Sequence, residues 1–316
     1  MATGNSYSYQ KSEQNKNYLI KKFDSSREYY FYHEYFTNKY LYNLDPNYVA
    51  KIYKINKTNY EIYYEFLPQR KVIGNENSID YIDIIKSIHR KSEKSSSNFN
   101  LYAKESFKSL SQTFINIENR IQKISSLKSL DNQDLIEHLL HISLFLNLIR
   151  KNIFSNNIFS SEKFSHADSG IHNCILNKNG MLLINDLEYA GLDSPIKQCI
   201  DYLLHPKNNN NSLQNELWFN YFINDCIHEK DIKNLKFYFS LFALKWSLIL
   251  LNEFIPEIWD VRVHAYPLRL KNHDIILNNQ LEKSKIYFKK AKEIIDNEKT
   301  TNLFSKSEKI FISKSY

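Results

Sequence analysis

Glycine, proline and cysteine are scarce in this chain of 316 residues, which holds 5 Gly, 6 Pro and 3 Cys. So few Gly and Pro exclude a collagen-like or Gly/Pro-rich low-complexity protein. The three cysteines, Cys174, Cys199 and Cys226, stand far apart, so we expect neither a paired-cysteine zinc site nor a disulfide framework. Cysteines used in this way are typical of a reducing compartment.

Long hydrophobic runs and a strong charge excess are also missing. The most apolar stretch, residues 237–251, contains Lys245 and is shorter than the ~20 residues of a membrane span. No charged-then-apolar leader opens the chain. The net charge of +7 is spread along it, and the main basic run, residues 283–292, falls on one predicted helix. We therefore predict a cytoplasmic protein that binds neither membrane nor nucleic acid, and the oligomeric state stays open.

Aromatic residues are plentiful at 15%, and hydrophobic residues make up 42%, so the chain can bury a large core. Its first 70 residues alternate between strand-like and helix-like patterns, and most of the remainder has helical periodicity. The pattern predicts an α+β fold with a small mixed lobe (1–68), a larger mainly helical lobe (69–296) and a polar tail (297–316). The predicted strands and helices of the first lobe are strands 18–23, 48–53 and 60–66 and helix 27–40.

The helical part is interrupted once, between residues 160 and 191. Three of the five glycines, Gly170, Gly180 and Gly191, fall in this segment. Residues 175–184 read as a β-hairpin with a turn at Asn-Lys-Asn-Gly. Helical patterns surround it, and the predicted helices are residues 79–89, 101–127 and 131–151 and a helical segment over residues 195–295.

Polar residues with metal-ligating and proton-accepting side chains flank the predicted hairpin at both ends. His-Ala-Asp-Ser-Gly-Ile-His-Asn occupies residues 166–173, ahead of the first strand, and Asp-Leu-Glu occupies residues 186–188, after the second. Because a hairpin brings its two ends together, Asp168, Asn173 and Asp186 can converge. Phosphoryl transfer needs a carboxylate at the acceptor hydroxyl and oxygen ligands for Mg²⁺. The alternative, a polar loop that only turns the chain, does not explain these spacings together.

The spacing H-x-D-x-x-x-x-N followed by D-x-E resembles the aminoglycoside phosphotransferase and choline kinase family, relatives of protein kinases. That family shows H-G-D-x-H-x-x-N and then I-D-F-E, and residues 184–195 are similar to its I-D-F-E-Y-A-G-x-D-D-P run. The resemblance implies a protein-kinase-like two-lobe fold and transfer of the ATP γ-phosphate to a hydroxyl of an amino alcohol, sugar or related metabolite. It implies ATP and Mg²⁺ as cofactors and a small-molecule hydroxyl acceptor as partner.

The resemblance also assigns roles to the motif residues. It makes Asp168 the catalytic base, and Asn173 and Asp186 the Mg²⁺ ligands. His172 keeps no assigned role. Three further residues take supporting roles, namely Glu188 as a weaker metal candidate, His166 as a loop-bracing residue and Asp201 as a helical residue that braces the catalytic loop.

A nucleotide-binding lysine is expected on the strand at residues 18–23. Tyr-Leu-Ile-Lys, ending at Lys21, resembles the kinase strand V-A-I-K, whose lysine contacts the α- and β-phosphates. Lys51 follows a closer match in letters, but in this family a helix follows the lysine strand, which favours Lys21. Lys22 is the competitor if the register is shifted by one residue. On the following helix, Glu28 is the first candidate to pair with Lys21, and Glu34 is the second.

The remaining nucleotide contacts are expected at the hinge and at a phosphate loop. Residues 65–68 resemble the family's E-x-L-P, where backbone groups bind adenine, so Glu65 and Leu67 are cofactor-binding candidates. Ahead of Lys21, only residues 4–6 could form a phosphate loop. Either the first strand is missing or very short, or the start codon is misplaced.

An alternative function remains open. The chain can also be a degenerate kinase-fold protein that binds nucleotide or a partner without turnover, although Asp168, Asn173 and Asp186 are all present.

The acceptor site is expected near residues 253–260, where three carboxylates accompany Trp259. A cationic amine or a sugar suits such a surface. The alternative there is a helix end with one packed tryptophan.

Overall fold

The structure is a computed structural model, in which the chain forms two compact units. Unit 1 contains residues 1–106 and 162–221, and unit 2 contains residues 107–161 and 222–316. The described residues are 2–3, 6–13, 16–67, 77–95, 99–127, 132–152, 162–208, 211–265 and 267–296.

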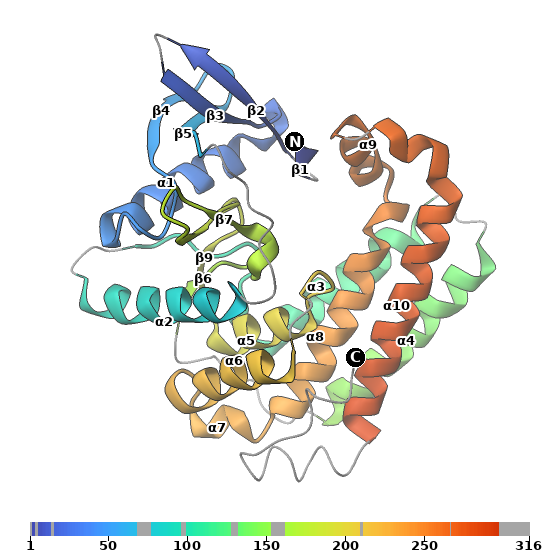
Figure 1. Ribbon diagram of the computed structural model, residues 1–316. Helices are drawn as coiled ribbons and strands as arrows, with labels where there is room; N and C mark the ends of the chain where they lie inside the picture. The colour runs from blue at the N-terminus through green and yellow to red at the C-terminus, as the bar shows by residue number, and fades with distance from the viewer. Residues whose placement is uncertain are drawn as a thin grey trace. The chain divides into compact units, whose positions relative to one another are not determined.

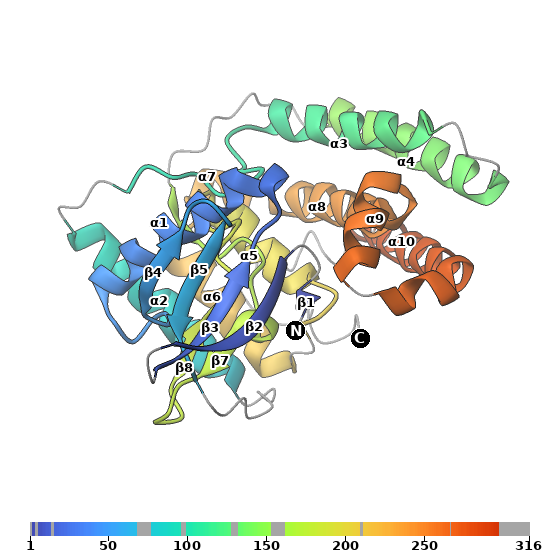
Figure 2. The same cartoon turned by 90° about the horizontal axis from the view of Figure 1, so that it is seen from above.

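Unit 1 begins with a five-stranded antiparallel sheet (Figure 1). Its strands lie in the order β1-β2-β3-β5-β4, and Figure 2 shows the sheet from above. In the register, Lys21 of β3 lies opposite Ser8 of β2 and Ile62 of β5. The strands are β1 (Ala2–Thr3), β2 (Ser6–Glu13), β3 (Lys16–Lys22), β4 (Ile52–Asn56) and β5 (Glu61–Glu65).

Helix α1 (Glu28–Leu44) follows β3 and packs on this sheet (Figure 1). The Asp24 side chain accepts the N–H of Ser26 and so caps the short 3₁₀ turn that leads into the helix. Phe31 of α1 is fully buried in a core with Ile62 and Tyr64 of β5. The order of lysine strand, helix and strand pair therefore matches the expectation.

The first strand, β1, is present and has only two residues. This agrees with the expectation of a very short first strand. Of the phosphate-loop candidates at residues 4–6, Gly4 and Asn5 lie outside the described residues, and Ser6 is the first residue of β2.

The predicted hairpin is formed by β7 (Cys174–Leu176) and β8 (Leu182–Ile184). Its turn uses Gly180 at φ +78°, where a glycine avoids steric strain. A second strand pair, β6 (Lys163–Ser165) with β9 (Gly191–Asp193), encloses the hairpin in sequence. The segment that enters the hairpin and the segment that leaves it are therefore held together twice, by the β6–β9 pair at one end and by the β7–β8 pair at the other.

One predicted strand begins later than expected. Residues 48–53 were expected as a strand, but β4 starts at Ile52. The reason is a competing partner, because the Ile184 N–H of β8 donates to the Tyr48 carbonyl at 2.7 Å. The chain at Val49 thus pairs with the hairpin and not with the large sheet.

One predicted helix is shorter than expected. Residues 101–127 have a helical pattern, but α3 begins only at Leu110. The backbone before it pairs with β9, since Ala103 N–H donates to the Leu192 carbonyl at 3.0 Å and Leu192 N–H donates to the Leu101 carbonyl at 2.8 Å. Sequence periodicity does not reveal a backbone partner that lies about 90 residues away.

The remaining described chain is mainly helical, and the predicted α+β, protein-kinase-like two-lobe class is confirmed. The segment 195–295 divides into several helices, and the lobe boundaries at residues 68 and 296 stay a prediction. The remaining helices are α2 (Ser78–Lys94), α3 (Leu110–Ser125), α4 (Gln133–Asn152), α5 (Pro195–Leu204), α6 (Ser212–Asp225), α7 (Glu229–Ile232), α8 (Leu235–Leu250), α9 (Pro256–Ala265) and α10 (His273–Asp296).

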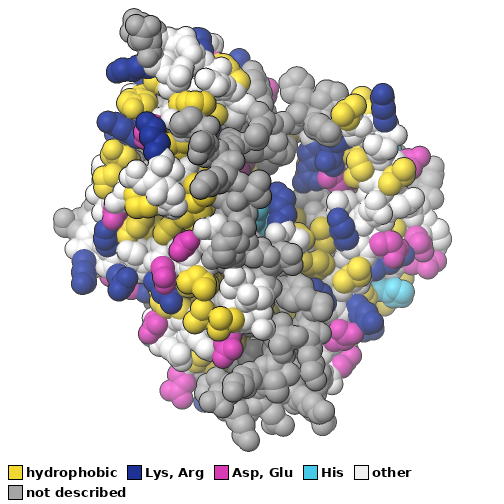
Figure 3. All heavy atoms as spheres, in the orientation of Figure 1, with side chains coloured by type: hydrophobic (Ala, Val, Ile, Leu, Met, Phe, Trp, Pro, Cys, Tyr) yellow, Lys and Arg dark blue, Asp and Glu magenta, His cyan; other side chains and the backbone are white. Residues whose placement is uncertain are grey.

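One apolar helical segment, Leu235–Phe254, has the length and composition of a membrane span. In this structure 67% of its most apolar window is buried within the protein. Core helices of soluble proteins meet the same criteria. On the face shown in Figure 3, the described Lys and Arg side chains are dispersed among acidic and hydrophobic ones.

Gly191 provides a test of the packing around β9. A Cβ at this position would meet the Ala103 nitrogen and the Tyr102 carbonyl carbon at 2.5 Å. Gly191→Ala should therefore lower the free energy of unfolding by about 1–3 kcal/mol, measured by urea denaturation. The control is Gly180→Asn in the open hairpin turn, because asparagine tolerates a positive φ. We expect this variant to lose less than about 0.5 kcal/mol in the free energy of unfolding. Equal losses in the two variants would contradict this packing.

Candidate active site

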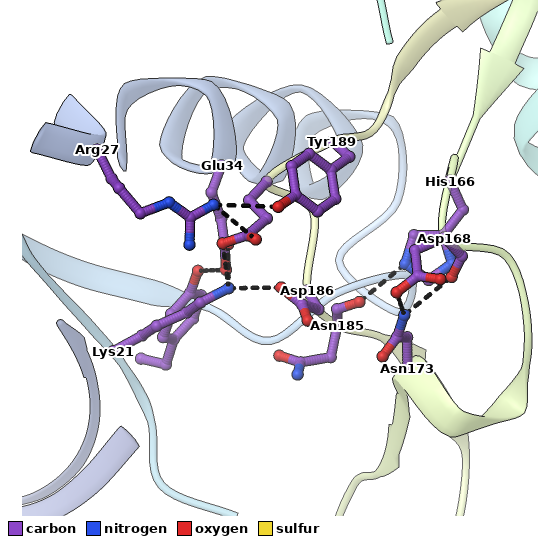
Figure 4. Close-up of polar contacts among 11 residues, drawn as sticks. Lys21, Arg27, Glu34, His166, Asp168, Asn173, Asn185, Asp186 and Tyr189 are labelled. Atoms are coloured by element: carbon purple, nitrogen blue, oxygen red, sulfur yellow. Dashed lines mark hydrogen bonds and ion pairs between the residues drawn. The ribbon is translucent and has the colours of Figure 1, made fainter. Parts of the chain in front are cut away.

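Lys21 lies at the centre of a buried ion-pair cluster in unit 1 (Figure 4). Its Nζ is 2.5 Å from Glu34 Oε2, 2.6 Å from Asp186 Oδ1 and 3.6 Å from Glu188 Oε2. These residues come from β3, α1 and the loop after β8, so the cluster joins three distant parts of the sequence. We call Lys21, Glu34, Asp186, Glu188 and Arg27 the Lys21 cluster.

The expected partner of Lys21 was partly wrong. Glu28 was the first candidate, but it is exposed at the first position of α1, whereas Glu34 is 1% exposed and contacts Lys21. The two glutamates are six positions apart, which is about 9 Å along a helix axis. Glu28 therefore lies more than a turn away from the cluster. The register expectation agrees with the structure, since Lys21 faces the cluster and Lys22 is partly exposed.

The cluster holds its charges by mutual pairing. Burial alone would lower the pKa of Lys21, but the charges of Asp186, Glu34 and Glu188 outweigh it and raise that pKa above its ordinary value. Burial raises the pKa of Glu34 to about 7, against the opposing charge of Lys21. The Tyr64 hydroxyl also donates to Glu34 at 2.5 Å. Lys21 thus remains an ammonium.

Arg27 is a member of this cluster that the sequence analysis missed. It is buried at the end of the turn before α1, and its Nη2 donates to Glu188 Oε1 and to the Tyr189 hydroxyl, both at 3.1 Å. Its guanidinium also lies over the Tyr30 ring, 4.4 Å from the ring centre. Nothing in the local sequence marks Arg27, because the residues that accept these two hydrogen bonds are more than 160 residues away.

Asp168 is held in a second group, the Asp168 cluster, which contains Asp168, His172, Asn173 and His205. Asn173 Nδ2 donates to Asp168 Oδ2 at 2.8 Å and to the Asp168 carbonyl at 2.9 Å (Figure 4). His205 Nε2 donates to Asp168 Oδ1 at 2.7 Å. Burial would raise the pKa of Asp168, but the neighbouring His172 and His205 side chains hold that pKa well below its usual range. Asp168 is therefore a carboxylate, and a third of its side chain is exposed.

The loop is fixed to the end of the hairpin by hydrogen bonds. The His166 Nε2–H donates to the Asn185 carbonyl at 2.8 Å, and Asn185 N–H donates to the Asn173 carbonyl at 2.9 Å. Burial lowers the pKa of His166, which agrees with a neutral, loop-bracing side chain. These bonds place Asn173 next to the residue before Asp186, so the two ends of the motif do converge.

Gly170 is required by close contact within this loop. Its φ is +152°, and a Cβ there would lie 2.0 Å from the Asn208 side-chain oxygen. Asn208 is itself buried and donates to the Ser169 and Tyr202 carbonyls. The scarcity of glycine in the chain was therefore a useful signal at this position.

Asp201 lies on α5 and forms an ion pair with Lys197. Lys197 Nζ is 3.1 Å from Asp201 Oδ2 and 2.8 Å from Asp193 Oδ2. Burial opposes the charge of Lys197, but the two aspartates raise its pKa above the ordinary value. This buried bridge connects α5 to β9. The role of Asp201 in bracing the catalytic loop itself stays a prediction.

The two hinge candidates lie at the end of β5. Glu65 pairs with Tyr18 of β3, and its N–H donates to the Lys51 carbonyl at 2.8 Å. Leu67 packs against the core under the sheet. Within the described residues, neither side chain takes part in the Lys21 or Asp168 cluster. Pro68 lies outside the described residues.

Two residues of the acceptor site expected in unit 2, Glu253 and Trp259, already contact arginines. Glu253 is 4% exposed, and its Oε1 accepts hydrogen bonds from Arg262 and Arg269. Trp259 is 8% exposed and is covered by the Arg269 guanidinium and the edge of the His273 ring. The structure therefore favours the alternative of a packed tryptophan.

Among known proteins, the chain matches solved structures only. No protein-family model and no curated protein matches the chain. The choline kinase LicA from Streptococcus pneumoniae superposes with a TM-score of 0.54 at 15% identity over 90% of this chain and 89% of that one. A choline kinase from Cryptosporidium parvum gives 0.58 at 14% identity over 92% and 87%. The streptomycin–ATP complex of APH(2")-IIa gives 0.53 at 12% identity over 82% and 92%.

The chain has the protein-kinase-like fold of these enzymes. They are choline kinases and an aminoglycoside phosphotransferase, the same family that the sequence motif resembles. At 11–15% identity the likeness establishes the fold, and function has to be argued from the site.

The pairing of Lys21 with Glu34, and not with Glu28, can be tested by substitution. Glu34→Gln removes a charged partner from a buried ammonium and should lower the free energy of unfolding by about 1–3 kcal/mol. Glu28→Gln changes an exposed side chain and should cost less than about 0.5 kcal/mol. Urea denaturation of both variants measures the difference, and a larger loss for Glu28→Gln would refute the assignment.

Proposed function

We propose that this protein is a small-molecule kinase that transfers the γ-phosphoryl group of ATP to a hydroxyl of an amino alcohol, a sugar or a related metabolite. The observation that carries the proposal is the convergence of a buried lysine ammonium, Lys21, with Asp186, next to a loop that holds the Asp168 carboxylate. Catalysis of phosphoryl transfer depends mainly on positioning and charge stabilisation, which such an arrangement supplies.

ATP is the proposed phosphoryl donor because Lys21 of β3 places a fixed positive charge in the site, where it can bind phosphate oxygens. Lys21 would bind the α- and β-phosphate oxygens, with Glu34 holding its side chain in place. The backbone at Glu65 and Leu67 would bind the adenine. In support, LicA has also been solved with AMP, and APH(2")-IIa with ATP.

Mg²⁺ fits the oxygen atoms present. Carboxylate oxygens of Glu34, Asp186 and Glu188 all lie within 4.8 Å of one another. Asn173 uses its amide nitrogen for Asp168, which leaves its amide oxygen for a cation. Mg²⁺ prefers such hard oxygen ligands and takes only one or two protein carboxylates. Asp186 and Asn173 are its proposed ligands, with Glu188 a weaker one, and bound Mg²⁺ would neutralise phosphate charge.

Asp168 is the proposed catalytic base. Its low pKa keeps it ionised, and its partial exposure leaves it accessible to a hydroxyl group. A carboxylate of this kind orients the acceptor hydroxyl and receives its proton as the oxygen attacks the γ-phosphorus. The acceptor remains to be found by experiment, since Glu253 and Trp259, two of the residues expected to bind it, already contact arginines.

One observation favours a second candidate, a kinase-fold protein that binds nucleotide without turnover. Asp186 Oδ1, the proposed metal ligand, is paired with the Lys21 ammonium at 2.6 Å, and β1 is only two residues long. Nucleotide binding without ADP formation, with any acceptor, would support this alternative.

Replacing Asp168 tests the proposed chemistry. With Mg²⁺ and ATP, screening amino alcohols, sugars and aminoglycosides for ADP release should identify an acceptor for the native protein. Asp168→Asn keeps the shape but removes the base, so turnover should fall by about 10²–10⁴-fold. ATP affinity, measured by calorimetry, should be nearly unchanged. Native-like turnover in this variant would show that Asp168 is not the base.

A further inference from the structure

His205 holds the Asp168 carboxylate from the side opposite Asn173. Asn173 occupies Oδ2 of that carboxylate, whereas His205 Nε2 lies 2.7 Å from Oδ1. One donor on each oxygen fixes the rotation of the carboxylate about its Cβ–Cγ bond. The motif that identified Asp168 and Asn173 ends 32 residues before His205, so sequence reasoning gave it no role.

The tautomer of His205 follows from its neighbours. The backbone N–H of Lys207 donates to His205 Nδ1 at 3.1 Å, so Nδ1 must carry a lone pair and the proton must be on Nε2. That proton points at Asp168 Oδ1. Burial lowers the pKa of His205, which agrees with a neutral ring that acts as a donor. The α5 C-terminus thus presents one defined N–H group to the carboxylate.

The ring plane of His205 is fixed by a second histidine. The His172 ring stacks on it with centroids 4.3 Å apart and planes 19° apart. Asn208 donates its amide N–H groups to the Ser169 and Tyr202 carbonyls, so its oxygen faces His172 Nδ1 at 3.3 Å. His172 is therefore held in turn by the loop after α5. Its Nε2 lies 3.5 Å from Asp168 Oδ1.

A metal ion is the other explanation for two histidines beside an aspartate. The ligand atoms of Asp168, His172 and His205 do lie within 4.8 Å of one another. Metal binding through His205 Nε2 would require the proton to move to Nδ1, where the Lys207 N–H already donates. The hydrogen-bond pattern therefore disfavours a metal and favours a donor.

We propose that His205 is a positioning residue, which directs the Asp168 carboxylate toward the acceptor hydroxyl through its Nε2–H. This rests on the proposed kinase function. If orientation is lost at a catalytic group, rates fall steeply, by as much as about 100-fold for a displacement near 1 Å. The nucleotide would be bound by the separate Lys21 cluster, so the effect should appear in kcat and not in the KM for ATP.

The kinetic test compares two substitutions at one position. His205→Leu removes the donor and should lower kcat about 10- to 100-fold with an unchanged KM for ATP. His205→Gln retains a side-chain N–H and should recover most of the loss. The control, His138→Leu, removes a buried histidine that bonds Ser284 in unit 2, and should lower the melting temperature without changing kcat. Equal kcat values for His205→Leu and the native protein, or no recovery in His205→Gln, would overturn the proposal.

A second measurement does not depend on turnover. In the proton NMR spectrum of the native protein, the His205 Nε2–H should give a slowly exchanging downfield signal, which His205→Gln removes and Asp168→Asn shifts. A signal that is insensitive to Asp168→Asn would overturn the positioning role even if the protein is active. A native protein that shows the signal but transfers no phosphate would instead refute the proposed function, and with it the catalytic purpose of the contact.

Discussion

The burial of one lysine ammonium among three carboxylates is the constraint on which the rest of the site depends. Removing a charge from water costs several kcal/mol per ion, so Lys21 is tolerated only while its partners remain in place. Those partners come from α1 and from the loop after the hairpin. The ion pairs therefore fix how helix and hairpin meet the sheet, and Arg27 balances part of the remaining negative charge at Glu188.

The hairpin extends this constraint to the loop that holds Asp168. Its two strands bring residue 173 beside residue 185, and His166 closes the loop by binding the Asn185 carbonyl. Asp186 adopts φ +61°, an unusual conformation for a non-glycine residue that turns the chain directly after Asn185. Asp168 is then oriented by donors from two directions, Asn173 within the loop and His205 from α5. Such fixed polar groups act without reorganisation during a reaction.

Sequence patterns predicted the features that are local in the chain and missed those that depend on distant partners. The lysine strand, the aromatic helix and the hairpin were predicted because each has its own periodicity or turn. Asp168 and Asp186 were found because their spacing around the hairpin resembles a family motif, and Lys21 was found because its strand, followed by a helix, resembles the lysine strand of kinases. Glu28 was preferred over Glu34 because helix phase relative to the sheet is not visible in sequence. Arg27 and His205 were missed because the carboxylates that they bind lie far along the chain. Glu253 was taken as an acceptor-binding residue because its contacts with Arg262 and Arg269, which lie 9 and 16 residues later, are not visible in the sequence.

Calorimetric titration of ATP with and without Mg²⁺ tests the central claim most directly, because it measures nucleotide binding at the Lys21 cluster without knowledge of the acceptor. The account predicts that Mg²⁺ strengthens ATP binding to the native protein. It also predicts that this dependence is lost in Asp186→Asn, while the exposed Glu28→Gln variant behaves as the native protein does. ATP binding that is equally strong in Asp186→Asn, with the same Mg²⁺ dependence, would contradict the account.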